Sequence, residues 1–362
     1  MITQPKTGAV ATIAISALAV GFCTLFTPEQ FSSWVTLILV AMVPGQIIQT
    51  LFLGSALPGS LNQLPQPFKG LMLTGIMVVA GAISFVFLQS MNEGVLNTPT
   101  PFSIMLSIFT VVVTLWLVIV FQGWPFKLLK NPFVSALTLW IATLLLSWLL
   151  FQLLFDFSLF QGAPFYSPTL DPSGLLPAWQ ALALVTTSVA VILVFVLLDF
   201  WPLCFLKANP LSSALAIAVI SLLVWSVALF GLNTDPVRYM VAGPISMIFG
   251  EFILLVMLQT APFQQVKQPK KGGLLSLSAL GLCLLLYPLY ESTVAYLYPA
   301  LPSGAPMYGV ELWIASAMLA VTFPMFVMYA EMFQFWPLNT GTAQESPDTS
   351  QGVSTEESVN ER

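Results

Sequence analysis

Histidine is absent from this chain of 362 residues, and only 7% of the residues are charged. Without histidine there is no His-ligated haem, no common His-rich iron or copper site and no His-based acid–base relay. The cysteines, Cys23, Cys204 and Cys283, form no CxxC pair and no metal-binding spacing. The phosphate-binding patterns GxxxxGKS/T and GxGxxG do not occur, which argues against an ATP-hydrolysing domain in this chain. The sequence therefore predicts no cofactor and no metal site.

Hydrophobic residues, in contrast, make up 57% of the chain, and the mean hydropathy is +0.91. A soluble domain carries about 25% charged residues, so this composition indicates a membrane protein. Crossing about 30 Å of hydrocarbon takes about 20 apolar residues, and the backbone in lipid must bond internally, which favours helices. The short alternating segments of a β-barrel are missing. Ten apolar runs predict an all-α integral membrane protein with spans at about 8–26, 33–55, 69–90, 103–123, 133–155, 178–200, 211–232, 238–260, 274–294 and 308–334.

The cations indicate the orientation of these spans. Eight of the ten Lys and Arg residues lie before the first run or after even-numbered runs: Lys6, Lys69, Lys127, Lys130, Lys207, Lys267, Lys270 and Lys271. Positive residues mark the cytoplasmic side, so both termini are predicted inside. The opposite connections carry acids, with Arg238 as their only cation. We expect a multi-pass protein of a bacterial-type inner cell membrane, with the lipid bilayer as a partner and no nucleic acid.

Two segments between or beyond the runs differ in composition. Residues 339–362 contain no aromatic residue and almost no aliphatic ones, which is typical of a disordered tail, here acidic and cytoplasmic. The connection 156–178 holds aromatic residues among several prolines. We expect it to pack over the outer face as a lid or a short interfacial piece.

A recurring junction follows the even runs. It reads FQGWPFKLLKNPF at 121–133, DFWPLCFLKANPL at 199–211 and FQFWPL at 333–338, with a weaker copy, LQTAPFQQVKQPKK, at 258–271. Four of the five even runs are thus followed by a similar polar, aromatic and proline-containing segment. The recurrence predicts an internal repeat of helical hairpins.

The junction residues have two interpretations. A polar residue stands three positions before each proline, in the pairs Gln122 and Pro125, Asp199 and Pro202, Gln259 and Pro262, and Gln334 and Pro337, and Trp124, Trp201 and Trp336 directly precede three of the prolines. Proline stops a helix, tryptophan prefers the headgroup level, and glutamine can bond the last carbonyls of a helix. The favoured interpretation is therefore a helix stop at the membrane interface. The alternative is that the four polar residues ring a cytoplasmic vestibule.

Polar residues deep in the spans are candidates for function, because a charge at the bilayer centre costs at least about 2.5–3.5 kcal/mol. Glu251, near the middle of the eighth run, is the deepest acid, and Glu331 lies one turn inside the last junction. Glu251 is expected either protonated and hydrogen-bonded or facing water, as a structural bridge or as a proton or cation site. Gln46 and Gln49 form a second deep pair beside Pro44. Together with Pro244 and Pro324, Pro44 predicts kinked even helices around a path or pocket.

The arrangement resembles the tellurite-resistance/dicarboxylate transporter family, which includes slow-type anion channels. The resemblance covers the spans and rests on the segments from Trp124-Pro125 to Pro132-Phe133, from Trp201-Pro202 to Pro210-Leu211 and from Pro262-Phe263 to Pro269. It implies five inner helices around a nearly uncharged anion pore. The family has its kinking prolines on odd helices, whereas here they are on even ones, and its gating phenylalanine has no match in the ninth run. No site residue is therefore transferred.

Three classes of function remain in order of preference. The first is a channel or secondary transporter for a small solute or anion, which repeated hairpins and kinked helices favour. The second is a non-catalytic membrane subunit or scaffold of a larger complex, such as a redox or quinone complex, with a membrane-complex partner or a homo-oligomer. An intramembrane enzyme is least favoured, because the chain lacks paired Asp, Ser-Lys or His clusters. The sequence does not name the solute.

Overall fold

The computed structural model describes residues 4–91, 97–206 and 210–338. Ten helical stretches in this part are long and apolar enough to cross a membrane. Their bounds are Lys6–Cys23, Pro28–Phe52, Phe68–Ser90, Pro101–Val120, Pro132–Leu154, Ala178–Leu197, Pro210–Gly231, Pro236–Met257, Lys270–Leu297 and Gly309–Met332. The predicted all-helical fold is confirmed, and the ten predicted apolar runs correspond to ten helical stretches of spanning length and composition. The predicted tail, residues 339–362, lies outside the described residues.

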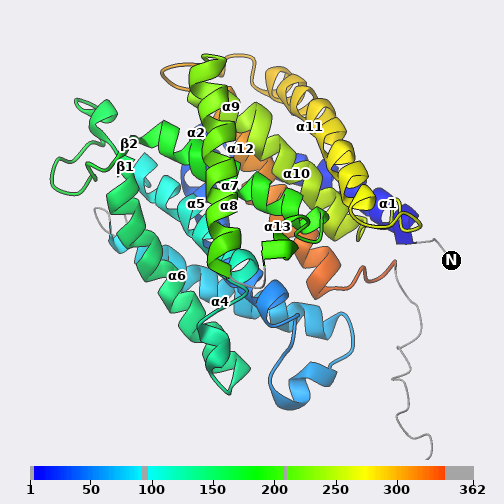
Figure 1. The fold of residues 1–362 in the computed structure, drawn as a ribbon. Helices are drawn as coiled ribbons and strands as arrows, with labels where there is room; N and C mark the ends of the chain where they lie inside the picture. Colours follow the sequence, from blue (N-terminus) through cyan, green and yellow to red (C-terminus); the bar gives the residue numbers. More distant parts are fainter. Residues whose placement is uncertain (1–3, 92–96, 207–209, 339–362) are drawn as a thin grey trace, which may run out of the picture.

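These spans fall into two groups by burial. In the odd-numbered spans, 22% to 33% of the most apolar stretch is buried, and in the even-numbered spans the share is 61% to 72%. We call the even-numbered spans the inner spans and the odd-numbered spans the outer spans. The bundle is thus a core of five helices with five helices around it (Figure 1).

The outer spans are mostly continuous α-helices. They consist of α1 (Gln4–Cys23), α4 (Phe68–Ser90), α6 (Pro132–Leu154), α8 (Pro210–Ser226) and α11 (Lys270–Leu297). Only α8 ends in a π-helical turn, Val227–Gly231. The apolar side chains that face outward from these helices, such as Leu284 and Leu149, are exposed in the absence of lipid.

Four of the five inner spans combine α-helix with π-helical turns, and the sixth span is a single α-helix. Their α-helical parts are α2 (Pro28–Gln30), α3 (Thr36–Ile47), α5 (Pro101–Leu115), α7 (Ala178–Leu197), α9 (Pro236–Met240), α10 (Ser246–Phe252), α12 (Gly309–Ala315) and α13 (Phe323–Val327). The π-helical turns are Phe31–Val35, Ile48–Phe52, Trp116–Val120, Val241–Ile245, Ile253–Met257, Ser316–Thr322 and Met328–Met332. Such turns interrupt the regular hydrogen-bond ladder and are often found at functional sites. Two of them lie beside the predicted kink positions, since Pro244 is inside one and Pro324 follows another.

The inner spans close into a ring. The helix α3 packs on α5, α5 packs on α7, and α7 packs on α9 and α10. The span that contains α10 packs in turn on the last span, Gly309–Met332, and that span packs back on α3. Each inner span therefore has two inner neighbours.

The start of a span is set by local chemistry. Proline occupies the first helical turn at Pro28, Pro101, Pro132 and Pro236, where the missing N–H has no helical partner to lose. The Thr27 side chain and Gln30 form a capping box, and Asn131 caps α6. These signals fix where the spans begin.

Helical ends meet at two faces of the bundle. The acidic face, where the inner spans begin, carries Glu29, Asp156, Asp235 and Glu311. The lysine face, where the inner spans end, carries Lys69, Lys127, Lys267 and Lys271.

On the acidic face, residues 155–177 fold into a lid held by two short parallel strands, β1 (Phe155–Asp156) and β2 (Leu176–Pro177). The side chain of Phe157 in this lid is buried, as the sequence predicted for a packed connection.

Candidate functional site

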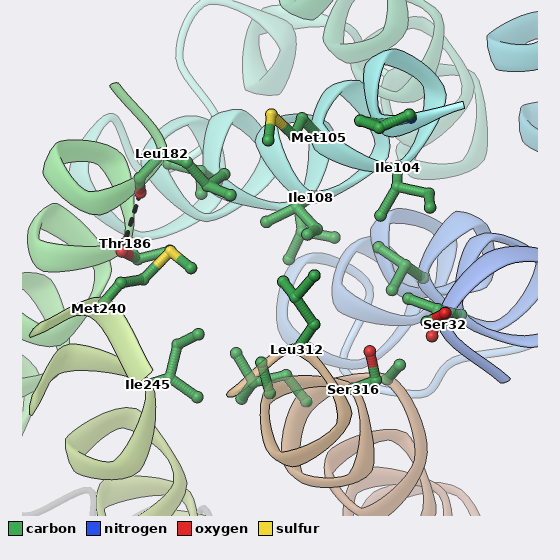
Figure 2. A pocket seen from close by; sticks show the side chains of 18 of the residues that line it. Ser32, Ile104, Met105, Ile108, Leu182, Thr186, Met240, Ile245, Leu312 and Ser316 are labelled. Carbon is green, nitrogen blue, oxygen red and sulfur yellow. Dashed lines mark hydrogen bonds between the residues drawn. The ribbon is translucent and has the colours of Figure 1, made fainter. Parts of the chain in front are cut away.

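A cavity of about 400 Å³ lies inside the ring of inner spans. Every inner span contributes side chains to it, for example Thr36, Ile108, Thr186, Ile245 and Leu312. Figure 2 shows side chains of the inner spans, among them Ile108, Met240 and Leu312, pointing into the same space. The cavity therefore lies on the axis of the bundle.

The cavity begins at the acidic face. Phe160 and Phe165 from the lid and Trp179 at the start of α7 line it there. Aromatic contacts hold these rings together, since the centroids of Phe160 and Phe165 are 5.6 Å apart and those of Phe160 and Trp179 are 6.0 Å apart. The lid thus forms part of the mouth of the cavity.

Five side chains close the other end of the cavity. Along each inner span from the acidic face, the last lining residues are Val43, Leu115, Val189, Phe252 and Phe323. We call these five residues the floor. The rings of Phe252 and Phe323 are its largest members, and their centroids are 4.1 Å apart. Past the floor, each inner span continues to the lysine face through packed side chains such as Ile47 and Met257.

The lining is mostly aliphatic and aromatic. Among the residues that line the cavity in the described part of the chain, no side chain is charged. Hydroxyl groups are supplied by Ser32, Ser33, Thr36, Thr186 and Ser316. All of these lie between the mouth and the floor, with Thr186 about one turn from Val189, so the floor itself has no polar side chain.

A second cavity of about 440 Å³ lies at the side of the bundle, between α5, α6, α7 and α8. Its lining is apolar except for hydroxyls such as Ser188, which accepts a hydrogen bond from Trp116 Nε1 at 3.0 Å. Val112 lines both cavities. One helical layer therefore separates the central cavity from this lateral one.

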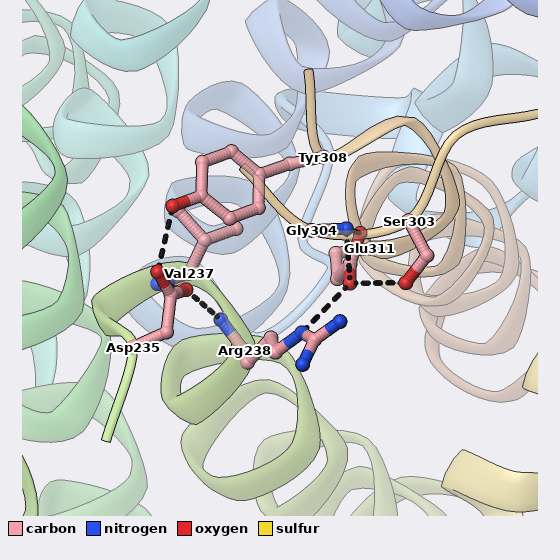
Figure 3. A network of polar contacts seen from close by, with 7 residues as sticks. All are labelled: Asp235, Val237, Arg238, Ser303, Gly304, Tyr308 and Glu311. Carbon is pink, nitrogen blue, oxygen red and sulfur yellow. Dashed lines mark hydrogen bonds and ion pairs between the residues drawn. The ribbon is translucent and has the colours of Figure 1, made fainter. Parts of the chain in front are cut away.

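A polar network fixes the loop beside the mouth (Figure 3). The buried carboxylate of Glu311 accepts hydrogen bonds from Ser303 Oγ at 2.8 Å and from the Gly304 amide at 3.0 and 3.1 Å. Arg238 Nε lies 3.4 Å from the same carboxylate. The neighbouring loop residues Pro306 and Met307 line the cavity. The network thus connects the eighth and tenth spans where the cavity opens.

Asp235 and Tyr308 extend this network. Asp235 caps α9 by accepting hydrogen bonds from the Val237 and Arg238 amides, both at 3.0 Å. The Tyr308 hydroxyl donates to Asp235 Oδ2 at 2.7 Å. Burial, followed by this hydrogen bond and the nearby carboxylates, raises the pKa of Tyr308 to about 12. The phenol therefore stays protonated and can donate throughout the physiological pH range.

Glu251 is fully buried, and neither of its carboxylate oxygens has a hydrogen-bond partner among the described residues. It does not line either cavity, although its neighbour Phe252 belongs to the floor. Gly250 packs against the Ala279 carbonyl on α11, and Glu251 lies within electrostatic range of Cys283 on the same helix. A buried carboxylate without a hydrogen-bond partner or counter-ion is costly, so the protonated, uncharged form of Glu251 is the one compatible with this site.

Gln46 and Gln49 are buried past the floor. Gln46 Nε2 donates to the Pro324 carbonyl at 2.9 Å, so this amide joins two of the proline-containing inner spans. The Oε1 atoms of both glutamines have no partner among the described residues. Glu331 is half-buried in the last π-helical turn and is also separate from the cavity lining. The structure therefore does not gather the deep polar candidates into one site.

The junction residues act through the backbone. Gln122, Asp199, Gln259 and Gln334 all have positive φ, between 48° and 52°, and their side chains are exposed. The residue after each of them also has positive φ, and Gly54 and Ser55 form a fifth such pair at the end of the second span. At these ends, amides bond to carbonyls five or six residues back, as Phe121 does to Trp116 and Gly123 to Leu117. Backbone amides thus bond these carbonyls.

The prolines and tryptophans of the junction follow these helix ends. Trp124, Trp201 and Trp336 are between 41% and 56% exposed, and each is joined by a cis peptide bond to the next residue, Pro125, Pro202 or Pro337. Pro262 occupies the matching position after Gln259. None of the polar residues, tryptophans or prolines of the junction lines either cavity, and Phe121 at the start of the first junction lines the lateral one.

Sequence reasoning missed a set of contacts at the start of the outer spans. Gln66 Nε2 donates to the Met332 carbonyl, the last residue of the tenth span, at 2.8 Å, and Gln66 Oε1 accepts from the Gly70 amide at 3.2 Å. Gln268 makes the same pair of bonds, to the Leu197 carbonyl at 3.1 Å and from the Gly272 amide at 2.9 Å. Each glutamine therefore joins the start of an outer span to the end of an inner span.

A sequence signal for these contacts is present. The outer spans begin with QPKTG at 4–8, QPFKG at 66–70, NPFVS at 131–135, NPLSS at 209–213 and QPKKG at 268–272. The common pattern is an amide residue, proline, two variable residues and then glycine or serine. The small residue lets a neighbouring inner span approach, since a Cβ at Gly272 would lie 2.6 Å from the Leu197 carbonyl oxygen.

The comparisons with known proteins identify no relative. No family model, no curated protein sequence and no solved structure matches the chain.

Proposed function

We propose that this chain is a multi-pass channel or secondary transporter for a small solute in a bacterial-type inner membrane. The observation that carries the proposal is the central cavity, which all five inner spans line, which begins at the acidic face and which ends at the floor. A passive structural bundle has no need of an axial cavity with a mouth. The path runs along the axis of the ring, and Phe252 and Phe323 close it.

The orientation and the repeat are part of the same proposal. The lysine face is cytoplasmic, because positive residues mark that side, and both termini are inside. The chain consists of five hairpins of one outer and one inner span. Three features support this division: the recurring helix ends with two residues of positive φ, the QPxxG-type starts of the outer spans and the alternation of buried and exposed spans. The resemblance to the tellurite-resistance/dicarboxylate transporter family stays a prediction.

The test is to open the floor. In proteoliposomes, Phe252→Ala combined with Phe323→Ala removes the two rings that close the path. We expect chloride flux, glycerol flux or both to rise by about tenfold over the unmodified protein, because a widened constriction lowers the barrier by about 1.4 kcal/mol or more. Phe230→Ala is the matched control, since Phe230 is 65% exposed on an outer span.

Two further results bear on the proposal. If neither probe moves faster in the double variant than in Phe230→Ala, the axial path is wrong. Glu251→Gln is expected to leave flux through the opened variant unchanged, because Glu251 does not line the cavity. A change in the pH dependence of flux in Glu251→Gln would instead place this acid on a proton route.

A further inference from the structure

The hydroxyl groups of the central cavity face it mainly as hydrogen-bond acceptors. The hydroxyls of Ser33, Thr36 and Thr186 donate to backbone carbonyls of their own spans, at 2.6, 2.7 and 2.9 Å. Ser32 makes a longer bond of the same kind, at 3.3 Å. A hydroxyl whose hydrogen is used in this way offers only its lone pairs to a ligand. These four groups therefore suit a ligand that donates a hydrogen bond.

Ser316 is different from the other hydroxyls. It lies on the wall of the cavity, and Figure 2 shows its oxygen directed toward the open space. No hydrogen bond to another described residue involves its hydroxyl. Ser316 is thus available to donate or to accept, on the span next to the acceptors of the second span and across the cavity from Thr186.

This arrangement disfavours ions of either sign. An anion needs several donors or a cation, and the lining offers one open hydroxyl and no Lys or Arg among the described residues. A cation needs carboxylates or several carbonyl ligands, and the lining has no acid either. The cost of removing an ion from water would remain uncompensated. A neutral ligand avoids this cost.

The polarity is also graded along the cavity. The hydroxyls stand above the floor, whereas the floor itself is Val43, Leu115, Val189, Phe252 and Phe323. A ligand with an apolar body and one polar end matches this gradient, with its apolar part against the floor and its polar end near the hydroxyls. Most pockets that bind such molecules combine an apolar wall with a few placed polar groups.

We propose that the central cavity binds a neutral, mainly apolar molecule that carries a hydroxyl or a similar hydrogen-bond donor at one end. This inference rests on the proposed function, because it names the class of solute for the same path. A single-chain alcohol and a neutral membrane lipid such as a diacylglycerol both have an apolar body with a hydroxyl at one end.

The experiment measures equilibrium binding of radiolabelled 1-dodecanol to the full-length protein in detergent. We expect saturable binding that unlabelled 1-dodecanol displaces and that dodecanoate, ionised at about pH 9, displaces at least roughly tenfold less well. Displacement by dioleoylglycerol as well would identify the neutral-lipid source, and displacement by the alcohol alone would identify the smaller solute. Binding is measured without flux, so the proposed transport can fail while this inference holds.

Matched variants locate the binding site. Ala315→Trp fills the central cavity, and Ala218→Trp places the same side chain in the lateral cavity. We expect at least a roughly tenfold loss of affinity in Ala315→Trp and wild-type affinity in Ala218→Trp. Ser316→Ala is expected to lower the affinity for 1-dodecanol by a smaller factor than Ala315→Trp does, without changing the yield of folded protein.

Three results would overturn the inference. One is equal displacement by dodecanoate and 1-dodecanol, which would indicate an anion site. Another is loss of binding in Ala218→Trp with full binding in Ala315→Trp, which would place the ligand in the lateral cavity. The third is the absence of any saturable binding of 1-dodecanol.

Discussion

Left-handed backbone conformations at residues other than glycine cost roughly 1–2 kcal/mol each. Two consecutive residues adopt this conformation where each inner span ends, and three of these five pairs contain no glycine. Asp199 and Phe200 are one such pair, and Gln259 and Thr260 are another. Glycine or asparagine is the usual signal for this conformation, so glutamine gave no indication of it. The sequence pattern did predict that a helix stops at each junction. The pattern could not show that the polar residue takes a left-handed backbone conformation, in which backbone amides cap the end of the helix.

The mouth network was also beyond sequence reasoning. Asp235 and Tyr308 are 73 positions apart, and only the packing of the eighth span against the tenth brings them together. Glu311 lies in the first turn of α12, and its pairing has no local sequence signal. Its partner Arg238 was identified only as the one cation among acids. Contacts between distant segments depend on the arrangement of helices, which no local pattern specifies.

Tyr308 makes the stability of this network depend on alkaline pH. Its pKa is raised from 10.0 to about 12, chiefly by burial. Between these two values the unfolded chain has released the proton and the folded chain retains it, so stability falls as pH rises through this window. We expect the apparent unfolding temperature of the purified protein to drop more steeply between about pH 10 and 12 than that of Tyr308→Phe.

The control for this experiment is Tyr296→Phe, because the Tyr296 side chain is 86% exposed. Its profile should coincide with that of the unmodified protein. If Tyr308→Phe shows the same steep decline as the unmodified protein, Tyr308 is not the titrating group.

Among the elements, the spans were predictable and their grouping was not. The predicted run 69–90 corresponds to the observed span Phe68–Ser90, and the predicted run 133–155 corresponds to the span Pro132–Leu154. Inner and outer spans have overlapping hydropathies, 1.8 to 2.6 and 1.6 to 2.4, because lipid is as apolar as a protein core. Hydropathy therefore cannot tell a helix that faces lipid from one that faces other helices. The sequence carries no signal for the π-helical turns themselves. The prolines Pro244 and Pro324 indicated only that the helices near them are irregular.

The outer spans depend on close approach at their first turn. Gly272 lies where a Cβ would be 2.6 Å from the Leu197 carbonyl oxygen, whereas a Cβ at Gly273 would have no neighbour within 4 Å. We expect Gly272→Ala to destabilise the protein by about 1–3 kcal/mol through overpacking. Gly273→Ala should be neutral or stabilise α11 by up to about 1 kcal/mol, since alanine favours helix.

Thermal unfolding of the two variants in the same detergent provides the comparison. Because the two glycines are adjacent in one helix, their helix propensity is nearly matched, and the variants differ mainly in the contact that the added methyl group meets. Equal unfolding temperatures for the two variants would show that the contact between α11 and the sixth span is not tight in solution.

For the whole molecule, the native cysteines offer a test of orientation. Cys204 is exposed at the lysine face, and Cys23 and Cys283 are buried. A membrane-impermeant maleimide should label the unmodified protein in inside-out vesicles and not in right-side-out vesicles, because the lysine face is predicted cytoplasmic. Leu175→Cys in a Cys204→Ser background should show the reverse, since Leu175 is 72% exposed in the lid. The opposite labelling pattern would invert the topology.

The ring also has a consequence for biosynthesis. The first outer helix, α1, packs at Gly8 against the Met257 carbonyl, and α4 is joined through Gln66 to Met332. Ribosomes deliver the N-terminal spans long before residues 257 and 332 exist. In the proposed membrane topology, these early helices therefore keep an unfilled contact surface until the last inner span has been made. The final span completes the ring, so a nascent chain stopped before it is a natural target for membrane quality control.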